Sequence, residues 1–144
     1  MGGSLPVITL LDTHALVWLL EGNPRLGQKT RDLVFAAAQA ERLYVSAIAP
    51  WEIAMLVSKG RLAFAQEIGE WLKVAFAMPG IRLAPLSIEI SVASTQLPGD
   101  FHADPADRMI VATARHLGAT LVTEDKLILG YSQTGYLKVQ RAGT

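Results

Sequence analysis

The chain has 144 residues, of which 51% are hydrophobic, and this suits a single domain with a sizeable core. It has no cysteine, so disulfides, thiolate metal sites and a thiol nucleophile are excluded. Its 13 basic and 13 acidic residues cancel, and no apolar run is long enough to span a membrane. Composition alone therefore indicates neither a nucleic-acid nor a membrane partner. Residues 1–6 are predicted to be a flexible leader or a cloning remnant, and residues 7–144 a single domain.

The first part of the domain alternates between strand and helix patterns. Residues 7–11 (VITLL) are apolar or β-branched throughout, as in a buried central strand, and residues 13–20 have helical spacing. A longer amphipathic helix is predicted over 25–40 and a short strand over 43–46. Residues 47–59 then form a predicted helix that ends before a glycine.

The middle of the chain continues the alternation. An amphipathic helix is predicted over 65–77 and a strand over 81–85. Ser87 is predicted to cap a helix that runs to about Gln96, and residues 97–103 form a predicted loop.

The local signals are strongest in residues 104–125. Asp104 is a predicted helix N-cap, and Pro105 fits the first helical position, where its missing N–H costs nothing. Gly118 stands where a left-handed residue ends a helix, and residues 119–123 are apolar enough for an interior parallel strand. This segment is therefore predicted as a capped helix followed by a buried strand.

A short helix from about residue 126 and a last strand near 136–139 complete the chain. Strands that alternate with helices predict βαβ units. We therefore expect an α/β fold, a three-layer α/β/α sandwich with a central, mostly parallel sheet.

Asp12, Asp107 and Asp125 are predicted at one edge of the sheet in such a fold, and Glu52 could also point toward that edge. Asp12 and Asp125 each follow a predicted strand, and Glu52 and Asp107 fall early in predicted helices. Open α/β sheets carry their sites at the carboxyl ends of the strands. Four carboxylates in one pocket repel each other unless a cation lies among them, and oxygen-only ligands favour Mg²⁺ or Mn²⁺. Such ions activate water and stabilise the attacking and leaving oxygens of a phosphodiester.

Four short motifs surround these carboxylates, in order along almost the whole chain. They are Asp12-Thr13-His14-Ala15-Leu16 after an apolar strand, Ser46-x-x-x-x-Trp51-Glu52-Ile53, His102-x-Asp104-Pro105-x-Asp107-Arg108, and Thr123-x-Asp125. Together they resemble the signature blocks of PIN-domain ribonucleases, and in particular of VapC-type toxins of bacterial toxin–antitoxin pairs.

The resemblance implies a metal-dependent endoribonuclease, commonly a homodimer, that is inhibited by a small antitoxin. A cytoplasmic location is expected, and the absence of cysteine is compatible with it. Asp12, Glu52, Asp107 and Asp125 match the acidic quartet of the family, as metal ligands and catalytic residues. Glu52 would complete the shell of Mg²⁺ or Mn²⁺, or orient the attacking water. Asp104 matches an acid near the site whose role varies. Hydrolysis of RNA would leave a 5′-phosphate and a 3′-hydroxyl.

Simpler roles compete at each of these positions. Asp12 and Asp125 could act only as helix caps, and Glu52 and Asp107 could act only as acids that favour a helix dipole. Asp104 is expected to be a cap rather than a ligand.

The neighbours of the quartet also receive predictions. His14 is expected to pack or hydrogen-bond behind the site, whereas His102 could orient a carboxylate or contact RNA. Thr13 and Thr123 are predicted to orient neighbouring carboxylates. Arg108 is expected to form an ion pair. The remaining cations near the motifs could contact phosphate, although charges at such places are usually only solvated; they are Lys59, Arg61 and Lys126.

Other functions compete with the nuclease. An aspartate-nucleophile phosphatase would have Asp-x-Asp after the first strand, where this chain has Asp12-Thr13-His14. A phosphoacceptor receiver domain would need an acidic pair there and a lysine after the last strands, and neither pattern is present. A catalytically silent PIN-like scaffold that binds RNA or protein stays open, and an activity assay separates it from the nuclease. The apolar helices between residues 25 and 77 would suit a groove for an antitoxin tail.

Overall fold

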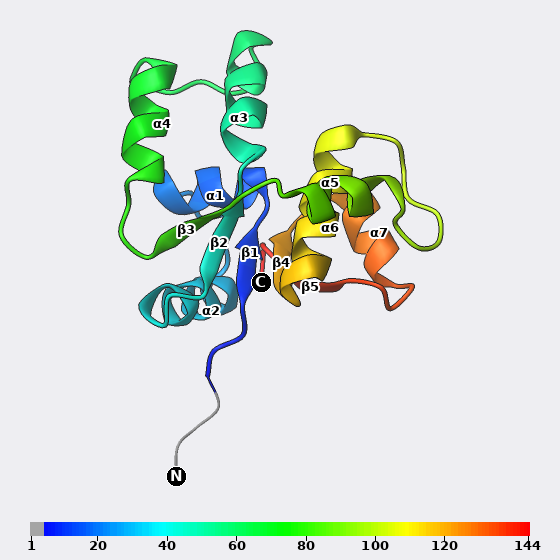
Figure 1. Ribbon diagram of the computed structural model, residues 1–144. Coiled ribbons are helices and arrows are strands. Elements are labelled where there is room, and N and C mark those ends of the chain that lie inside the picture. Colours follow the sequence, from blue (N-terminus) through cyan, green and yellow to red (C-terminus); the bar gives the residue numbers. More distant parts are fainter. Residues whose placement is uncertain (1–4) are drawn as a thin grey trace.

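Five parallel strands form the centre of the molecule, which a computed structural model describes for residues 5–144. The strands are β1 (Thr9–Leu11), β2 (Leu43–Ser46), β3 (Ile81–Ala84), β4 (Thr120–Thr123) and β5 (Lys138–Arg141). Their order is β3-β2-β1-β4-β5, and all four pairings are parallel (Figure 1). The sheet is thus parallel throughout the described residues. Residues 1–4, most of the predicted leader, lie outside the described part of the chain.

Helices cover both faces of this sheet, which confirms the predicted three-layer sandwich (Figure 1). One side carries α1 (Thr13–Leu20), α2 (Gln28–Gln39), α3 (Ala49–Ser58) and α4 (Ile68–Phe76). The other side carries α5 (Ile88–Thr95), α6 (Pro105–Leu117) and α7 (Lys126–Ser132). No helix among residues 5–144 has the length and apolar character needed to cross a membrane.

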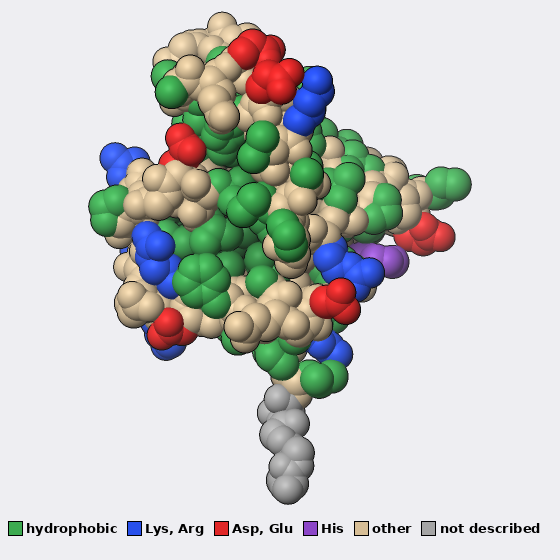
Figure 2. All heavy atoms as spheres, turned by 90° about the vertical axis from the view of Figure 1, so that its left-hand side faces the viewer, with side chains coloured by type: hydrophobic (Ala, Val, Ile, Leu, Met, Phe, Trp, Pro, Cys, Tyr) green, Lys and Arg blue, Asp and Glu red, His purple; other side chains and the backbone are tan. Residues whose placement is uncertain are grey.

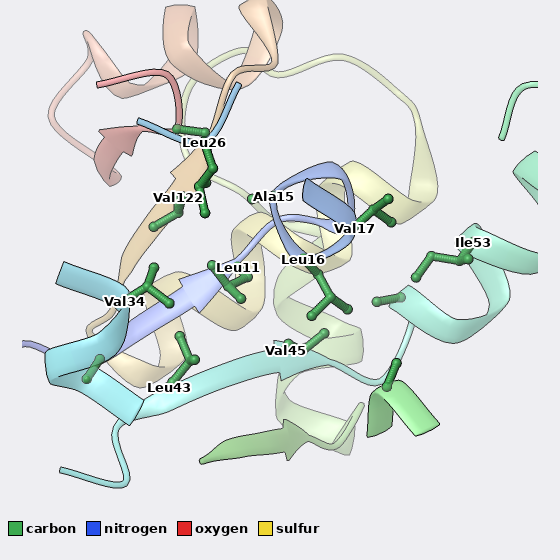
Figure 3. Packing of buried hydrophobic residues seen from close by; sticks show 14 of the residues in the cluster. Leu11, Ala15, Leu16, Val17, Leu26, Val34, Leu43, Val45, Ile53 and Val122 are labelled. Atoms are coloured by element: carbon green, nitrogen blue, oxygen red, sulfur yellow. The ribbon is translucent and has the colours of Figure 1, made fainter. Parts of the chain in front are cut away.

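The core is divided by the alternation of side chains along each strand. Leu11 and Val122 face α1 to α4, and Figure 3 shows them with Leu16 and Val34 from that side. Their strand neighbours point to the other face and pack against α6 and α7; they are Leu10 and Leu121. Because successive residues of a strand face opposite ways, a strand buried on both faces must be apolar at every position. Leu10, Leu11, Leu121 and Val122 satisfy this requirement, and the buried Thr9 hydroxyl donates to the Val7 carbonyl at 3.1 Å. The strand predicted over 7–11 begins only at Thr9, because Val7 is 50% exposed and lies before the paired strand.

The predicted helix ends agree best with the structure where a capping residue or a glycine specifies them. The Ser87 hydroxyl accepts the Ile90 N–H at 3.2 Å, and Gly118 ends α6 with φ 63°. The helix predicted over 65–77 begins only at Ile68, because Glu67 accepts the Glu70 N–H at 2.9 Å and caps it.

Two further boundaries were predicted too early. The helix predicted over 25–40 begins at Gln28, because a turn at Asn23 accepts the Arg25 and Leu26 N–H groups first. The last strand was predicted near 136–139 and lies at Lys138–Arg141, because the chain is still leaving the turn at Gly135 (φ 87°).

The topology makes the carboxyl ends of β1 and β4 the natural place for a site. These strands are neighbours, and the helices that follow them, α1 and α7, lie on opposite faces of the sheet. Ligands of open α/β sheets bind at such a switch point, where the chain departs to both sides. Asp12 and Asp125 are the residues that directly follow these two strands.

Candidate active site

Asp12 is buried at the end of β1, with 7% of its surface exposed. One carboxylate oxygen accepts the Thr13 N–H at 2.7 Å and caps α1, and the other accepts the Thr123 hydroxyl at 2.6 Å. Burial raises the pKa of Asp12, against the opposing effect of these hydrogen bonds. The side chain is a helix cap, as the simpler prediction had it, but the Thr123 hydroxyl at the end of β4 also holds it.

Glu52 reaches the same place from the first turn of α3. Its carboxylate accepts the hydroxyl of Thr13, the residue after Asp12. Burial raises the pKa of Glu52, and the negative charges of Asp12 and Asp104 add to the increase. Thr13 and Thr123 therefore both orient carboxylates, as predicted.

Asp107 lies in the first turn of α6, with 17% of its side chain exposed. Its Oδ2 is 2.9 Å from Nε2 of His102, although the two atoms do not have hydrogen-bond geometry. Burial, followed by the negative charges of the neighbouring carboxylates, raises the pKa of Asp107 to about 7. His102, whose role was left open, therefore contacts a quartet carboxylate.

Asp125 follows β4 and caps α7, where its Oδ1 accepts the Leu127 and Ile128 N–H groups at 2.9 and 3.0 Å. The residue before it, Glu124, is held by the Gly143 N–H and by the guanidinium of Arg141 at 2.7 and 3.1 Å. Burial acts to raise the pKa of Glu124, but these two contacts outweigh it and lower the pKa.

These side chains line one cleft of about 340 Å³. All four residues of the predicted quartet are in it. The lining residues are Asp12, His14, Trp18, Glu52, Met55, Leu56, Arg61, Asp104, Asp107, Glu124 and Asp125. Glu124 and Arg61 also line the cleft. Arg61 is one of the three cations predicted as possible phosphate contacts, whereas Glu124 was not predicted as a site residue, although its place between Thr123 and Asp125 was a usable signal.

Two predictions about neighbouring residues were wrong. His14 is exposed and lines the cleft, so it does not pack behind the site, because it falls on the outward side of α1. Arg108 forms no ion pair within the described residues 5–144; it donates to the carbonyl oxygens of Ser94, Phe101 and His102. Its guanidinium fixes the loop before α6, because the uncapped carbonyls of that loop need donors. Asp104 is the N-cap of α6, as expected, and accepts the Asp107 N–H at 3.1 Å.

The donor set fits a hard divalent cation. The cleft supplies oxygen ligands from six carboxylates, and three of these carboxylates have pKa values raised by burial and by one another. Among the described residues, no three acidic or imidazole groups are close enough to hold one ion together. Mg²⁺ commonly binds through one or two carboxylates and keeps several waters, so this spacing is compatible with it.

Comparison with known proteins identifies the class to which this fold and cleft belong. A sequence profile of the PIN domain matches residues 9–130, so the chain belongs to the PIN domain family. Within that family, the chain is 32% identical over 117 residues to Ribonuclease VapC22 of Mycobacterium tuberculosis. The match covers 81% of this chain and 86% of the relative.

Solved structures show the same fold at lower identity. VapBC2 from Rickettsia felis, bound to a DNA fragment from its promoter, matches with a TM-score of 0.66 and 17% identity over 92% of this chain and 96% of that one. FitAcB from Neisseria gonorrhoeae matches with a TM-score of 0.65 and 19% identity over 93% and 97%. At these identities the likeness establishes the fold alone.

Proposed function

We propose that this protein is a Mg²⁺- or Mn²⁺-dependent endoribonuclease of the VapC type. One observation carries the proposal: Asp12, Glu52 and Asp107 converge from three separate elements in one cleft, with raised pKa values. Raised pKa values at convergent carboxylates are typical of functional sites. The relative named Ribonuclease VapC22 supports the choice of RNA as substrate.

The four residues of the quartet have two proposed roles. Asp12, Asp107 and Asp125 would hold the ion directly or through water. When bound, the ion lowers the pKa of a water molecule and stabilises charge on the phosphodiester. Glu52, held in place by the Thr13 hydroxyl, would complete the shell or orient the attacking water. Attack by water on the phosphorus leaves a 5′-phosphate and a 3′-hydroxyl, and the RNA 2′-hydroxyl is not required.

The test is a cleavage assay. Purified protein is mixed with total RNA in the presence of Mg²⁺, Mn²⁺ or a chelator, and the chemistry of the new ends is determined. Cleavage that requires the ion and leaves 5′-phosphates is expected. Metal binding without any cleavage, by a folded protein offered each major RNA class, would instead favour the silent scaffold.

Thr123 provides a prediction about metal binding. Its hydroxyl donates to Asp12 Oδ2 at 2.6 Å and accepts the Asp125 N–H at 3.0 Å, so it couples two proposed ligands. We expect Thr123→Val to weaken Mn²⁺ binding and cleavage by about 10- to 100-fold. Thr113→Val is the control, because that hydroxyl is equally buried and bonds only Met109 in its own helix. Equal effects of the two substitutions would refute the role of Thr123.

A small antitoxin is the proposed inhibitor, supported by the toxin–antitoxin complexes among proteins of the same fold. An arginine of its tail would pair with the acidic cleft. Figure 2 shows hydrophobic side chains gathered on the face that carries α2 and α4, where two hollows of about 260 and 180 Å³ lie. Phe35 and Val74 line these hollows and are 53% and 56% exposed.

This face is the proposed groove for the antitoxin. We expect the double variant Phe35→Glu and Val74→Glu to bind the antitoxin more weakly by about tenfold or more, which is the size of loss seen at hot-spot residues of interfaces. Cleavage of RNA should be retained. Tyr136→Glu, at an exposed aromatic near α7, serves as the control. Undiminished binding by the double variant would show that the antitoxin docks elsewhere.

The remaining proposals concern assembly and location. A homodimer is proposed from the resemblance, and the molar mass in solution tests it. An RNA substrate and a protein inhibitor make the cytoplasm the proposed place of action.

A further inference from the structure

Arg61 is the single lysine or arginine among the described residues that line the acidic cleft. Six carboxylates share this cleft with it. An RNA backbone that approaches such a cleft meets a strongly negative surface, and one bound divalent ion offsets only part of that charge. The position of Arg61 is therefore the place where a permanent positive charge can meet the substrate.

The guanidinium of Arg61 is not used by the fold. Other arginines have defined partners: Arg31 donates to Leu26 and Asn23 carbonyls at 2.9 and 2.8 Å, and Arg141 pairs with Glu124 at 3.1 Å. Within residues 5–144, Arg61 forms no ion pair, although it lies in the same cleft as the carboxylates. Its side chain is exposed and free to bind a ligand.

The backbone of Arg61, in contrast, is fixed. Gly60 adopts φ 71° and ends α3, so that the Arg61 N–H donates to the Leu56 carbonyl at 2.9 Å. The next residue, Leu62, packs against the hydrophobic core. The helix end thus holds the arginine on the rim of the cleft.

We propose that Arg61 binds a phosphate of the RNA strand beside the phosphate that is cleaved. This inference rests on the proposed ribonuclease function and adds a substrate-binding residue to it. The scissile phosphate belongs at the carboxylates and their ion, and an exposed guanidinium in the same cleft matches a neighbouring phosphate bidentately. An arginine of a peptide inhibitor would pair with the carboxylates of the cleft and not with Arg61, whose own positive charge matches the phosphate of an RNA strand.

The test compares three substitutions in RNA binding. A fluorescein-labelled pool of random-sequence, single-stranded RNA is titrated in 50–200 mM KCl, in the Asp12→Asn background so that the RNA stays intact. We expect Arg61→Ala to weaken binding about three- to tenfold and to reduce the salt slope by about 0.7, the value for one phosphate contact. Arg61→Lys should keep the salt slope of the wild type and recover part of the affinity. Lysine retains the positive charge but lacks the paired N–H donors of the guanidinium.

Arg42→Ala is the matched control. Arg42 directly precedes β2, at the opposite end of the sheet from the carboxylates, and likewise forms no ion pair among residues 5–144. It should change neither the affinity nor the slope. With Asp12 intact, the two Arg61 variants should show their loss in KM rather than in kcat when RNA is cleaved, and Arg42→Ala should change neither.

The outcomes separate the two proposals. Equal RNA binding by Arg61→Ala and Arg42→Ala overturns the role of Arg61, and so does a loss confined to kcat. A protein without nuclease activity whose salt slope still falls with Arg61→Ala refutes the proposed function but keeps the phosphate contact.

Discussion

Replacement of Asp12 by asparagine is expected to reduce RNA cleavage by on the order of 10³-fold or more while the protein stays folded. The side chain caps α1 through the Thr13 N–H and accepts the Thr123 hydroxyl. Asparagine is an equally good cap, and its amide can still bond both partners once the threonine hydroxyl turns to accept. The substitution therefore removes the charge and a proposed metal ligand with little change in structure.

The measurement is the rate of cleavage of total RNA in Mg²⁺, together with the thermal unfolding midpoint. Asp32→Asn is the matched control, because Asp32 lies exposed on α2, where it accepts a hydrogen bond from the Gln28 side chain. Asp32→Asn should cleave like the wild type. If Asp12→Asn cleaved RNA at a comparable rate, Asp12 would be only a cap, and the proposed metal site would be wrong.

The elements that local chemistry specifies could be predicted from the sequence. Residues 104–125 have an aspartate cap, a proline at the first helical position and a left-handed glycine, and all three act where they were expected. The boundaries that failed depend on contacts outside the element. One example is the start of α2 at Gln28, which a turn at Asn23 precedes.

The site could be predicted in part for the same reason. Carboxylates that follow parallel strands must meet at one edge, so the quartet could be placed in one cleft before its geometry was known. The hydrogen-bond partners of the two threonines could not be predicted, because they are far away in the sequence. Thr123 donates to Asp12 across 111 residues, and Thr13 donates to Glu52 across 39. Arg108 was predicted to form an ion pair with an acidic residue, but it donates to backbone carbonyls. The sequence around Arg108 does not show how the preceding loop folds.

Metal binding is expected to depend steeply on pH near neutrality. Burial, and then the charges of the surrounding carboxylates, raise the pKa of Asp107 to about 7. A ligand must lose its proton before it binds the ion. We therefore expect Mn²⁺ affinity to fall about tenfold for each pH unit below 7, and more steeply where Asp12 and Glu52 also take up protons. Calorimetric titration with Mn²⁺ between pH 5.5 and 8 measures this, and an affinity independent of pH would contradict it.

The same raised pKa should make the metal-free protein less stable as the pH rises. The folded state retains the Asp107 proton up to a pH of about 7, whereas the unfolded chain releases it near 3.8, the ordinary pKa of an aspartate. Between these values the folded state binds more protons, so its free energy of unfolding falls with increasing pH. In a chelator, unfolding midpoints should therefore be higher at pH 5.5 than at pH 8.

Asp107→Asn tests this argument, because it removes the charge that the fold has to bury. In a chelator at pH 8, the variant should be more stable than the wild type by about 1–3 kcal/mol, and the advantage should disappear below pH 4. With saturating Mn²⁺ the order should reverse, since only the wild type gains the full free energy of metal binding. Asp32→Asn, at an exposed acid of α2, should show neither effect. A variant that is less stable than the wild type at pH 8 without metal would mean that Asp107 is a structural carboxylate, satisfied by its protein neighbours rather than by an ion.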